Sequence, residues 1–482
     1  MSKTYRAWNP RQSWLLPPSP QDWLPQEDLV YFLMDVVESL DISSITAVYE
    51  RNDQGFPPFH PRMMLCLLIY SYAMGVRSSR QIARHCQRDV GWRVIVGDDI
   101  PDFRTISGFR KMHVSAFSAL FLEVLGICQA AGLVKLGHLV LDGSKVKANA
   151  SRHKAMSYGR MVAEELRLKG EIATLLQEAE SQDASEDALL GAADQAHKLP
   201  QELARRETRL KQIQKAKALL EARYKSMAES KPVIEEQASG MGSQRDENND
   251  PSTGSAVQAA ESAAEDPSEV SQGAGSEATV PDKAQINFTD PESRIMRASN
   301  KGWDQCGNAQ VVVDSAHQII VAADITDQAN DVRQVLPMMA QAQKNVGEAN
   351  RIEKASMDAG YFSETNVQWM ESQGIDAYVA TGRLKHGEPL SSTPKESATA
   401  TISTATMSIK DRMFLKLRTD EGKAIYARRK AIVEPVFGQI KQAMGCRQFL
   451  LRGMRKMQAE WTLICMSFNL RKLFQAWRTG LA

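Results

Sequence analysis

A long polar and acidic stretch at residues 231–285 sets the first limit on how this chain can fold. It contains almost no large apolar side chains, and from Glu235 to Asp282 it carries eleven acids against one base, Arg245. Such a segment cannot bury enough apolar surface to offset the entropy lost on ordering, so we expect a disordered acidic linker. Any packed domain must therefore be built from the sequence on either side of it.

The residues before this linker have the pattern of two long amphipathic helices. Within 155–230, apolar residues recur at three-, four- and seven-residue spacings, which predicts a helical hairpin. The two stripes are Leu168, Ile172, Leu175 and Ala179, and Leu203, Leu210, Ile213, Leu220 and Tyr224. We expect the hairpin and the linker to interrupt one domain, made of residues 136–154 and 290–478.

Residues 1–135 have the character of a helical domain. A stretch PPFHPRMMLCLLIYSYAMG begins with prolines and ends at a glycine, and SSRQIARHCQRDV follows with serines that suit a helix cap. Next comes PDFRTISGFRK, and short helices with Arg and Ser or Thr at their starts are typical of helix-turn-helix DNA-binding domains. A helical bundle that does not touch DNA has the same pattern, so both interpretations stay open.

Strand-like runs lie on both sides of the insertion. They are HLVLD at 138–142, NAQVVVDSAHQIIVAADIT at 308–326, a run that ends near Asp358, and AYVAT at 377–381. Helical patterns separate the later runs and continue to the C-terminus. This order predicts an α/β domain, a mixed sheet with covering helices, preceded by the all-α N-terminal domain.

The charge of the chain is unevenly distributed. The net charge is only +1, yet residues 407–478 contain sixteen Lys or Arg against five acids, a net charge of +11. A basic end on a nearly neutral chain indicates a polyanionic partner such as DNA. A solvated basic helix without a partner is the alternative.

Composition argues against several other classes of protein. No run of about 18 apolar residues predicts a membrane span, and MSKTYRAWNPRQSW lacks the apolar core of a signal peptide. The six cysteines are far apart and form no C-x-x-C pair, so neither a zinc site nor a disulfide framework is expected. We therefore expect a cytoplasmic protein with no membrane partner.

Three acids stand out by their positions relative to the predicted elements. Asp142 follows the first strand, Asp358 follows a later one, and Glu434 lies on a basic helix after the last. Acids at strand ends of one sheet meet at one edge, where carboxylates can hold divalent cations for phosphoryl transfer. The local pattern at Asp142-Gly143 favours a hairpin turn instead, Asp324 is an alternative second acid, and a surface salt bridge is the alternative for Glu434.

Six stretches in this order resemble the DDE-type transposases of bacterial insertion sequences, in the group with an InsH-type N-terminal domain. They are FHPRMMLCLLIYSYAMGVRSSRQIARHCQRDVGWRVIVG with PDFRTISGFRK, LDGSKVKANAS, NAQVVVDSAHQIIVAADIT, SMDAGYFSE, RRKAIVEPVFGQIKQ and LLRGMRKMQAEWTLICMSFNLRKL. The resemblance covers most of the chain outside 155–285. It implies an RNase H-like catalytic domain in which Asp142, Asp358 and Glu434 hold two Mg²⁺ ions, with Mn²⁺ able to substitute.

The Tyr-Arg-Glu-Lys signature of related proteins fits only in part. Lys441 stands seven residues after Glu434, but Lys430 occupies the Arg position and Tyr426 stands eight rather than seven residues before Glu434. Spacings of four and seven predict that Lys430, Glu434 and Lys441 share one helical face.

The resemblance also implies the partners. We expect binding to the terminal inverted repeats of the element and to target DNA, as a homodimer in the DNA complex, in the cytoplasm at the bacterial nucleoid. An RNase H-like nuclease without strand transfer and an inactive DNA-binding protein are the alternative functions. The bases expected to contact DNA are Arg80, Arg104, Arg110 and Lys111 in the N-terminal domain, and Arg428, Arg429, Lys430, Lys441 and Arg452 near the C-terminus.

Overall fold

The computed structural model describes residues 19–50, 57–97, 99–186, 199–238, 280–298, 302–382 and 407–481. It contains two compact units. The first unit comprises Met1–Ala150 and Glu292–Ala482, and the second comprises Ser151–Pro291.

The first unit begins with helices. After a 3₁₀ turn at Pro20–Trp23, the α-helices are α1 (Leu29–Ser39), α2 (Ser43–Tyr49), α3 (Pro61–Ala73), α4 (Ser79–Arg88), α5 (Val90–Val96), α6 (Phe103–Met112) and α7 (Ala116–Ala130). Pro61 occupies the first turn of α3, where its missing N–H costs no hydrogen bond. Asp102 caps α6 by accepting from the backbone N–H groups of Arg104 and Thr105. The helical character predicted for this region is confirmed.

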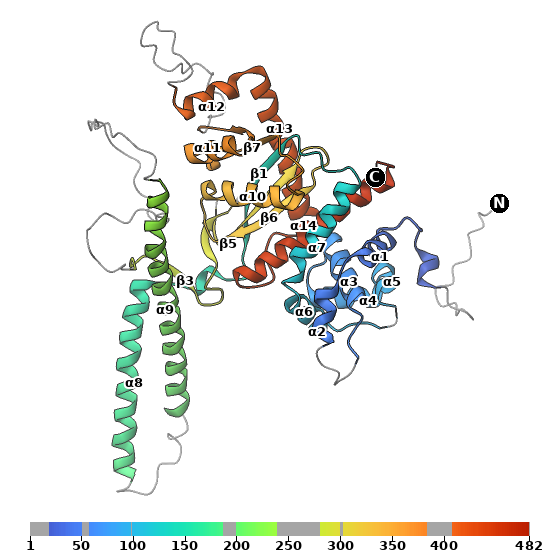
Figure 1. Ribbon diagram of the computed structural model, residues 1–482. Coiled ribbons are helices and arrows are strands. Elements are labelled where there is room, and N and C mark those ends of the chain that lie inside the picture. The colour runs from blue at the N-terminus through green and yellow to red at the C-terminus, as the bar shows by residue number, and fades with distance from the viewer. Residues whose placement is uncertain are drawn as a thin grey trace, which may run out of the picture. The chain divides into compact units, whose positions relative to one another are not determined.

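The rest of the first unit is a sheet with covering helices. Its strands are β1 (Leu139–Lys147), β4 (Arg294–Arg297), β5 (Trp303–Asp314), β6 (Ile320–Thr326), β7 (Lys354–Met357) and β8 (Asp376–Val379). The sheet runs β6-β5-β1-β7-β8, and β4 pairs with the beginning of β5. β5 is antiparallel to β1 and β6, whereas β7 is parallel to β1 and β8. The mixed sheet is the predicted fold class (Figure 1).

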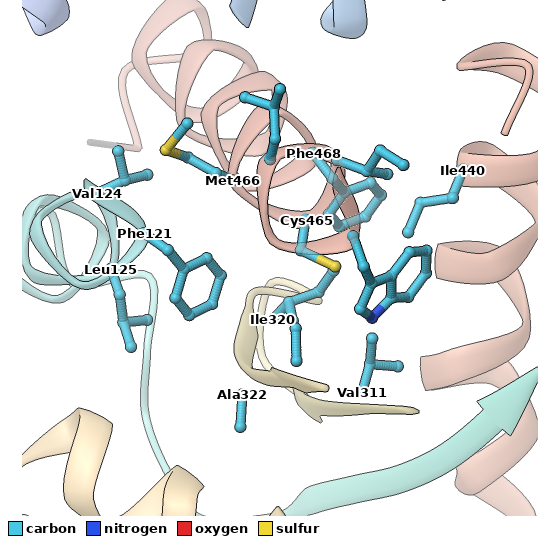
Figure 2. Close-up of a cluster of buried hydrophobic side chains, with 14 of the residues drawn as sticks. Phe121, Val124, Leu125, Val311, Ile320, Ala322, Ile440, Cys465, Met466 and Phe468 are labelled. Atoms are coloured by element: carbon cyan, nitrogen blue, oxygen red, sulfur yellow. The ribbon is translucent and has the colours of Figure 1, made fainter. Parts of the chain in front are cut away.

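Different helices pack on different parts of this sheet. The remaining helices of the unit are α10 (Val335–Val346), α11 (Glu364–Ser372), α12 (Ile409–Arg418), α13 (Asp420–Gly438), a π-helix at Gln439–Ala443 and α14 (Met454–Arg478). α10 packs on β5 and β6, while α13 packs on β1 and β7. The hydrophobic core joins α14 to the sheet and to α7. Figure 2 shows Cys465, Met466 and Phe468 of α14 with Phe121, Val124 and Leu125 of α7, and with Val311, Ile320, Ala322 and Ile440.

A buried ion pair joins the N-terminal helices to α14. Arg77 and Glu460 are 8% and 0% exposed, and their charged groups are 3.3 Å apart. Arg77 also donates to the carbonyl oxygens of Gly445 and Gln448. Glu460 accepts from the backbone N–H groups of Leu450 and Leu451. The residues on the two sides are more than 380 positions apart, so this pair fixes a long-range contact within the unit.

The second unit contains a long helical pair. Its helices are α8 (Tyr158–Glu186) and α9 (Leu199–Ala238), beside the two-stranded sheet β2 (Ala155–Ser157) and β3 (Gln285–Asn287). Of the predicted stripes, Leu168, Ile213 and Leu220 are buried in its core, together with Met161, Ala216 and Ile286. α9 extends into the segment expected to be disordered, and residues 239–279 of that segment lie outside the described residues.

One observation bears on membrane insertion. No single helix in the described part of the chain is long and apolar enough to cross a membrane. α6 and α7 meet the length and composition together, but they are bent by 81°.

Candidate active site

Asp142 lies in the middle of β1 rather than at its end. β1 pairs with β5 along its whole length, from Leu139 to Lys147. The Asp142-Gly143 pair is therefore part of a continuous strand, so the predicted hairpin turn is wrong and the predicted strand end is too early. The register with β5 is what keeps the strand extended through these polar residues.

The end of β7 opens the edge of β1 at Asp142. β7 pairs with β1 only at Leu139 and Val140. From Leu141 to Val146, no strand of the described residues covers this edge of β1. Asp358 directly follows β7, where its side chain accepts from the N–H of Gly360 at 2.9 Å. The two acids thus meet where one strand continues and its neighbour stops.

The pKa of Asp142 reflects its burial and the carboxylates near it. Burial, with smaller contributions from the negative charges of Asp358 and Asp331, raises the pKa of Asp142 to about 6. The N–H of Gly143 and the cation of Arg429 act in the opposite direction. The negative charges of Asp358 and Asp331 therefore act on Asp142, while burial is the main cause of its raised pKa. We call Asp142 and Asp358 the acid pair.

Arg429 and Tyr426 of α13 face the acid pair. The Arg429 guanidinium is 3.7 Å from a carboxylate oxygen of Asp142, and the residue is only 8% exposed. It also lies over the ring of Tyr426, 5.7 Å from its centroid. Burial, with contributions from Asp358 and Asp142, raises the pKa of Tyr426. The sequence predicts DNA contact for Arg429, and the structure places its guanidinium inside the unit against Asp142.

Glu434 is exposed on the flank of α13. It stands five residues after Arg429, about 140° around the helix. Tyr426 is closer in rotation, about 80° away, so Glu434 borders the side of α13 that carries Tyr426. Within the described residues it makes no hydrogen bond or ion pair, and no three His, Cys, Asp or Glu side chains are grouped to hold a metal ion. The structure therefore brings Asp142 and Asp358 together, and within the described residues it does not group Glu434 with them.

Asp331 is a residue that the sequence analysis missed. It lies just before α10 and accepts from Lys145 at 3.0 Å, from Asn308 at 2.6 Å and from Gln310 at 2.8 Å. Side chains alternate along β1, so Lys145 and Gly143 point to the face opposite Asp142. Asp331 thus supports the strand from behind. An acid directly before a predicted helix, in QANDVRQVLP, was the available signal.

Tyr361 connects the loop after Asp358 to the same network. Its hydroxyl donates to the side-chain oxygen of Gln310, and the residue is 1% exposed. The amide nitrogen of Gln310 in turn donates to Asn308 and Asp331. Gly143 packs directly against this group. A Cβ on Gly143 would overlap the Gln310 amide and would lie 3.0 Å from the Tyr361 hydroxyl oxygen.

We therefore expect Gly143→Ala to destabilise the protein by about 1–3 kcal/mol, because Gln310 is held by three partners and cannot give way. The measurement is the free energy of unfolding from urea titration. Gly108→Ala is the matched control. Gly108 lies within α6 and a Cβ there meets nothing within 4 Å, so that change should stabilise by about 0.5–1 kcal/mol. Equal effects of the two changes would contradict the packing at Gly143.

Two families of transposase domains match parts of this chain. Residues 278–470 match the family described as Transposase DDE domain, and residues 18–112 match the family described as Transposase domain (DUF772). The chain belongs to the DDE-type transposases of insertion elements. No curated protein and no solved structure matches it. The RNase H-like fold expected for the catalytic domain is confirmed by the DDE domain together with the mixed sheet. Asp358 and Glu434 lie inside the DDE match, and Asp142 precedes it.

The donor atoms of the transposase site fit a divalent cation. Mg²⁺ prefers carboxylate oxygen, and the acid pair supplies two carboxylates with one neighbouring cation, Arg429. Asp142 and Asp358 are the carboxylates that could hold it, and within the described residues no third acid is grouped with them. Glu434 has no competing partner among the described residues, so its side chain is available to join them.

Lys441 lies in a π-helix rather than in a regular α-helical turn. The π-helix at Gln439–Ala443 inserts an extra residue into the last turn. Lys441 is half-buried and donates to the Ser144 hydroxyl on β1, two residues beyond Asp142. Burial lowers the pKa of Lys441. The shared face with Lys430 and Glu434, predicted from regular helical spacing, stays a prediction.

The other bases predicted to contact DNA differ in how exposed their side chains are. Arg110 is 5% exposed and donates to the Tyr72 hydroxyl and to the carbonyl oxygen of Arg77. Its guanidinium is used inside the unit, so the assignment of Arg110 to DNA is corrected. Arg80 and Arg104 are exposed, and both lie over the ring of Phe103. The remaining exposed bases are Lys111, Arg428, Lys430 and Arg452.

Proposed function

We propose that this transposase cleaves DNA at the ends of its insertion element and joins the freed ends to target DNA in a Mg²⁺-dependent reaction. The observation that carries the proposal is the meeting of Asp142 and Asp358 where β7 ends beside β1. Two carboxylates on adjacent strands, reachable from solvent at an open strand edge, suit phosphoryl transfer on a large substrate. The family membership supports transposition as the process.

The reaction has two displacement steps of the same kind. Water attacks a phosphodiester at the element end and releases a 3′-hydroxyl group; that hydroxyl then attacks a phosphodiester of the target and releases a second 3′-hydroxyl. Bound Mg²⁺ would supply charge neutralisation for the attacked phosphate and for the entering and leaving oxygens. Asp142, Asp358 and Glu434 are the residues that would hold it, and Mn²⁺ should substitute.

The chain's own cations would position the DNA. Arg429 is buried beside Asp142, and within the described part of the chain its Nε has no hydrogen-bond acceptor. Such a donor is costly to leave unpaired, and a phosphate oxygen entering the site would satisfy it. Lys441, near Ser144, offers a second cation on the same face of β1. We infer that these two residues orient the reacting strand by its phosphates.

The proposed assembly follows from the number of DNA ends in the reaction. Two element ends must be cut and joined, so we expect a homodimer in the DNA complex, acting at the nucleoid in the cytoplasm. Size-exclusion chromatography with light scattering, with and without end DNA, measures the stoichiometry.

The test of the function uses the purified full chain with a labelled duplex that carries the repeat flanking the coding frame. With Mg²⁺ or Mn²⁺ we expect nicking at the repeat and covalent joining of the label to a target plasmid. EDTA should abolish both. Nicking without joining would instead favour the nuclease, and repeat binding without nicking would favour an inactive DNA-binding protein.

A further inference from the structure

A basic pocket lies between the end of α6 and the start of α14. Its volume is about 480 Å³. The lining residues are Lys111, Met112, Val114, Glu292, Arg452, Gly453, Arg455 and Lys456. Two of them, Lys111 and Arg452, were assigned to DNA contact from separate parts of the sequence, and the fold brings them together. Neither member of the acid pair lines the pocket.

The pocket has four cations and one acid. Lys111, Arg452, Arg455 and Lys456 are all exposed, and none of them forms an ion pair within the described ranges. The acid, Glu292, already accepts from the backbone N–H of Met454. Four uncompensated cations around one concavity repel each other, so their placement favours a polyanionic ligand.

The Arg452 side of the pocket is held by the chain beneath it. The Nε of Arg452 donates to the carbonyl oxygen of Asn149 at 2.8 Å, and the Asn149 side chain donates to Leu450 at 2.7 Å. Glu460 accepts from the N–H groups of Leu450 and Leu451, both at 2.9 Å. The backbone that presents Arg452 is therefore fixed before any ligand arrives.

The Lys111 side is held by the buried pair described above. Arg110, the neighbour of Lys111, donates to the carbonyl oxygen of Arg77, and Arg77 pairs with Glu460. One buried carboxylate thus fixes both sides of the pocket relative to each other. A preorganised set of cations binds phosphate with a smaller loss of conformational entropy than mobile surface lysines do.

We propose that this pocket binds consecutive phosphates of a duplex DNA backbone, independently of base sequence, as a second DNA site beside the catalytic one. The proposal rests on the proposed function for its biological setting. Its chemistry rests only on the pocket: long cationic side chains suit phosphate oxygens, and phosphate contacts carry no base information.

The test measures the dissociation constant of a fluorescent 30-base-pair duplex against KCl concentration by anisotropy. Arg455→Ala combined with Lys456→Ala should reduce the salt slope by about one to two units and weaken binding at 0.1 M KCl about ten-fold. Both effects should be equal for a duplex from the element end and for an unrelated duplex. A slope and affinity equal to those of the unchanged protein would overturn the proposal, and an effect confined to the element end would show base recognition instead.

Two further variants make the result specific to the pocket. Glu292→Gln removes the one acid and keeps an acceptor for the Met454 N–H, so it should tighten binding and steepen the slope. Lys344→Ala with Lys410→Ala removes two exposed cations of α10 and α12 that do not line the pocket. It should leave the slope within error. Equal losses in this control and in the pocket variant would also overturn the proposal.

Failure of the pocket and failure of the proposed function give different results. If the unchanged protein binds duplex through the pocket but cleaves no DNA, the pocket stands and the catalytic proposal falls. If cleavage is normal and the salt slope is unaffected, only the pocket falls.

Discussion

Asp142→Asn and Asp358→Asn are each expected to lower the rate of DNA cleavage by a factor of at least about 10³ while leaving DNA affinity within about two-fold. Each change keeps the size of the side chain and removes the negative charge that would hold Mg²⁺. Affinity should be preserved because phosphate contacts come from cations. The measurement is single-turnover cleavage of end DNA at saturating protein, with anisotropy for binding.

Asp324→Asn is the matched control for this prediction. Asp324 lies on β6, and its side chain accepts from the N–H of Ile325. Burial raises the pKa of Asp324 as it does that of Asp142, yet Asp324 belongs to the strand on the far side of β5. Cleavage by Asp324→Asn should be unchanged. Full activity in Asp358→Asn with loss in Asp324→Asn would move the second acid to β6.

Asp142→Asn should also change stability in the absence of metal. The folded-state pKa of about 6 lies above the ordinary value of 3.8, so ionisation of Asp142 disfavours folding as pH rises through this range. At pH 8, removal of the charge should raise the free energy of unfolding by roughly 1–3 kcal/mol, and the gain should vanish below about pH 4. Urea titrations at both pH values in EDTA test this independently of catalysis.

The structural support for a catalytic role is weaker for Glu434 than for Asp142 and Asp358, and Glu434→Gln tests that role. The structure leaves Glu434 exposed, and its role rests on the family motif and on its position near the Tyr426 side of α13. A loss as large as that at Asp142 would support its turning toward the cation. A loss below ten-fold would leave the acid pair, supported by Asp331, as the catalytic carboxylates.

The sequence was sufficient to place Asp358 directly after a strand. It did not show that Asp142 lies within a longer strand. β7 is a short strand, KASM, and its end is visible as the turn DAGY. β1 continues through DGSKVK, where side chains on both faces serve polar partners. No alternation of apolar residues marks that half of the strand. Its pairing with β5, more than 150 residues later in the chain, is what makes it a strand.

The burial of Arg110 and Arg429 has a common physical cause. Residue type indicates that a side chain is charged, but burial depends on partners that the local sequence does not contain. Arg110 finds Tyr72 and the carbonyl oxygen of Arg77, and Arg429 finds Asp142. Lys441 lies in a π-helix, a turn that no spacing rule for a regular helix anticipates.

The buried pair of Arg77 and Glu460 leads to the largest expected effect on stability. Arg77→Ala should lower the free energy of unfolding by about 3–5 kcal/mol at pH 8, because the Glu460 carboxylate would stay buried without its neighbouring cation. Burial already raises the pKa of Glu460. Loss of Arg77 should raise the pKa of Glu460 further, so that in acid a proton neutralises the buried carboxylate. The destabilisation should therefore be smaller at pH 5 than at pH 8.

The control for Arg77→Ala is an exposed pair of the same unit. Lys354 and Glu421 are 3.0 Å apart, but their side chains are 34% and 70% exposed. Lys354→Ala should therefore cost no more than about 1 kcal/mol, with little dependence on pH. Replacing both buried partners, as Arg77→Met with Glu460→Met, should restore part of the stability lost in Arg77→Ala, because no buried charge is left unpaired. Urea titrations of the four proteins give the comparison. If Arg77→Ala and Lys354→Ala cost the same, the Arg77 pair is not what holds the N-terminal helices to α14, and the rigid sides of the basic pocket lose their explanation.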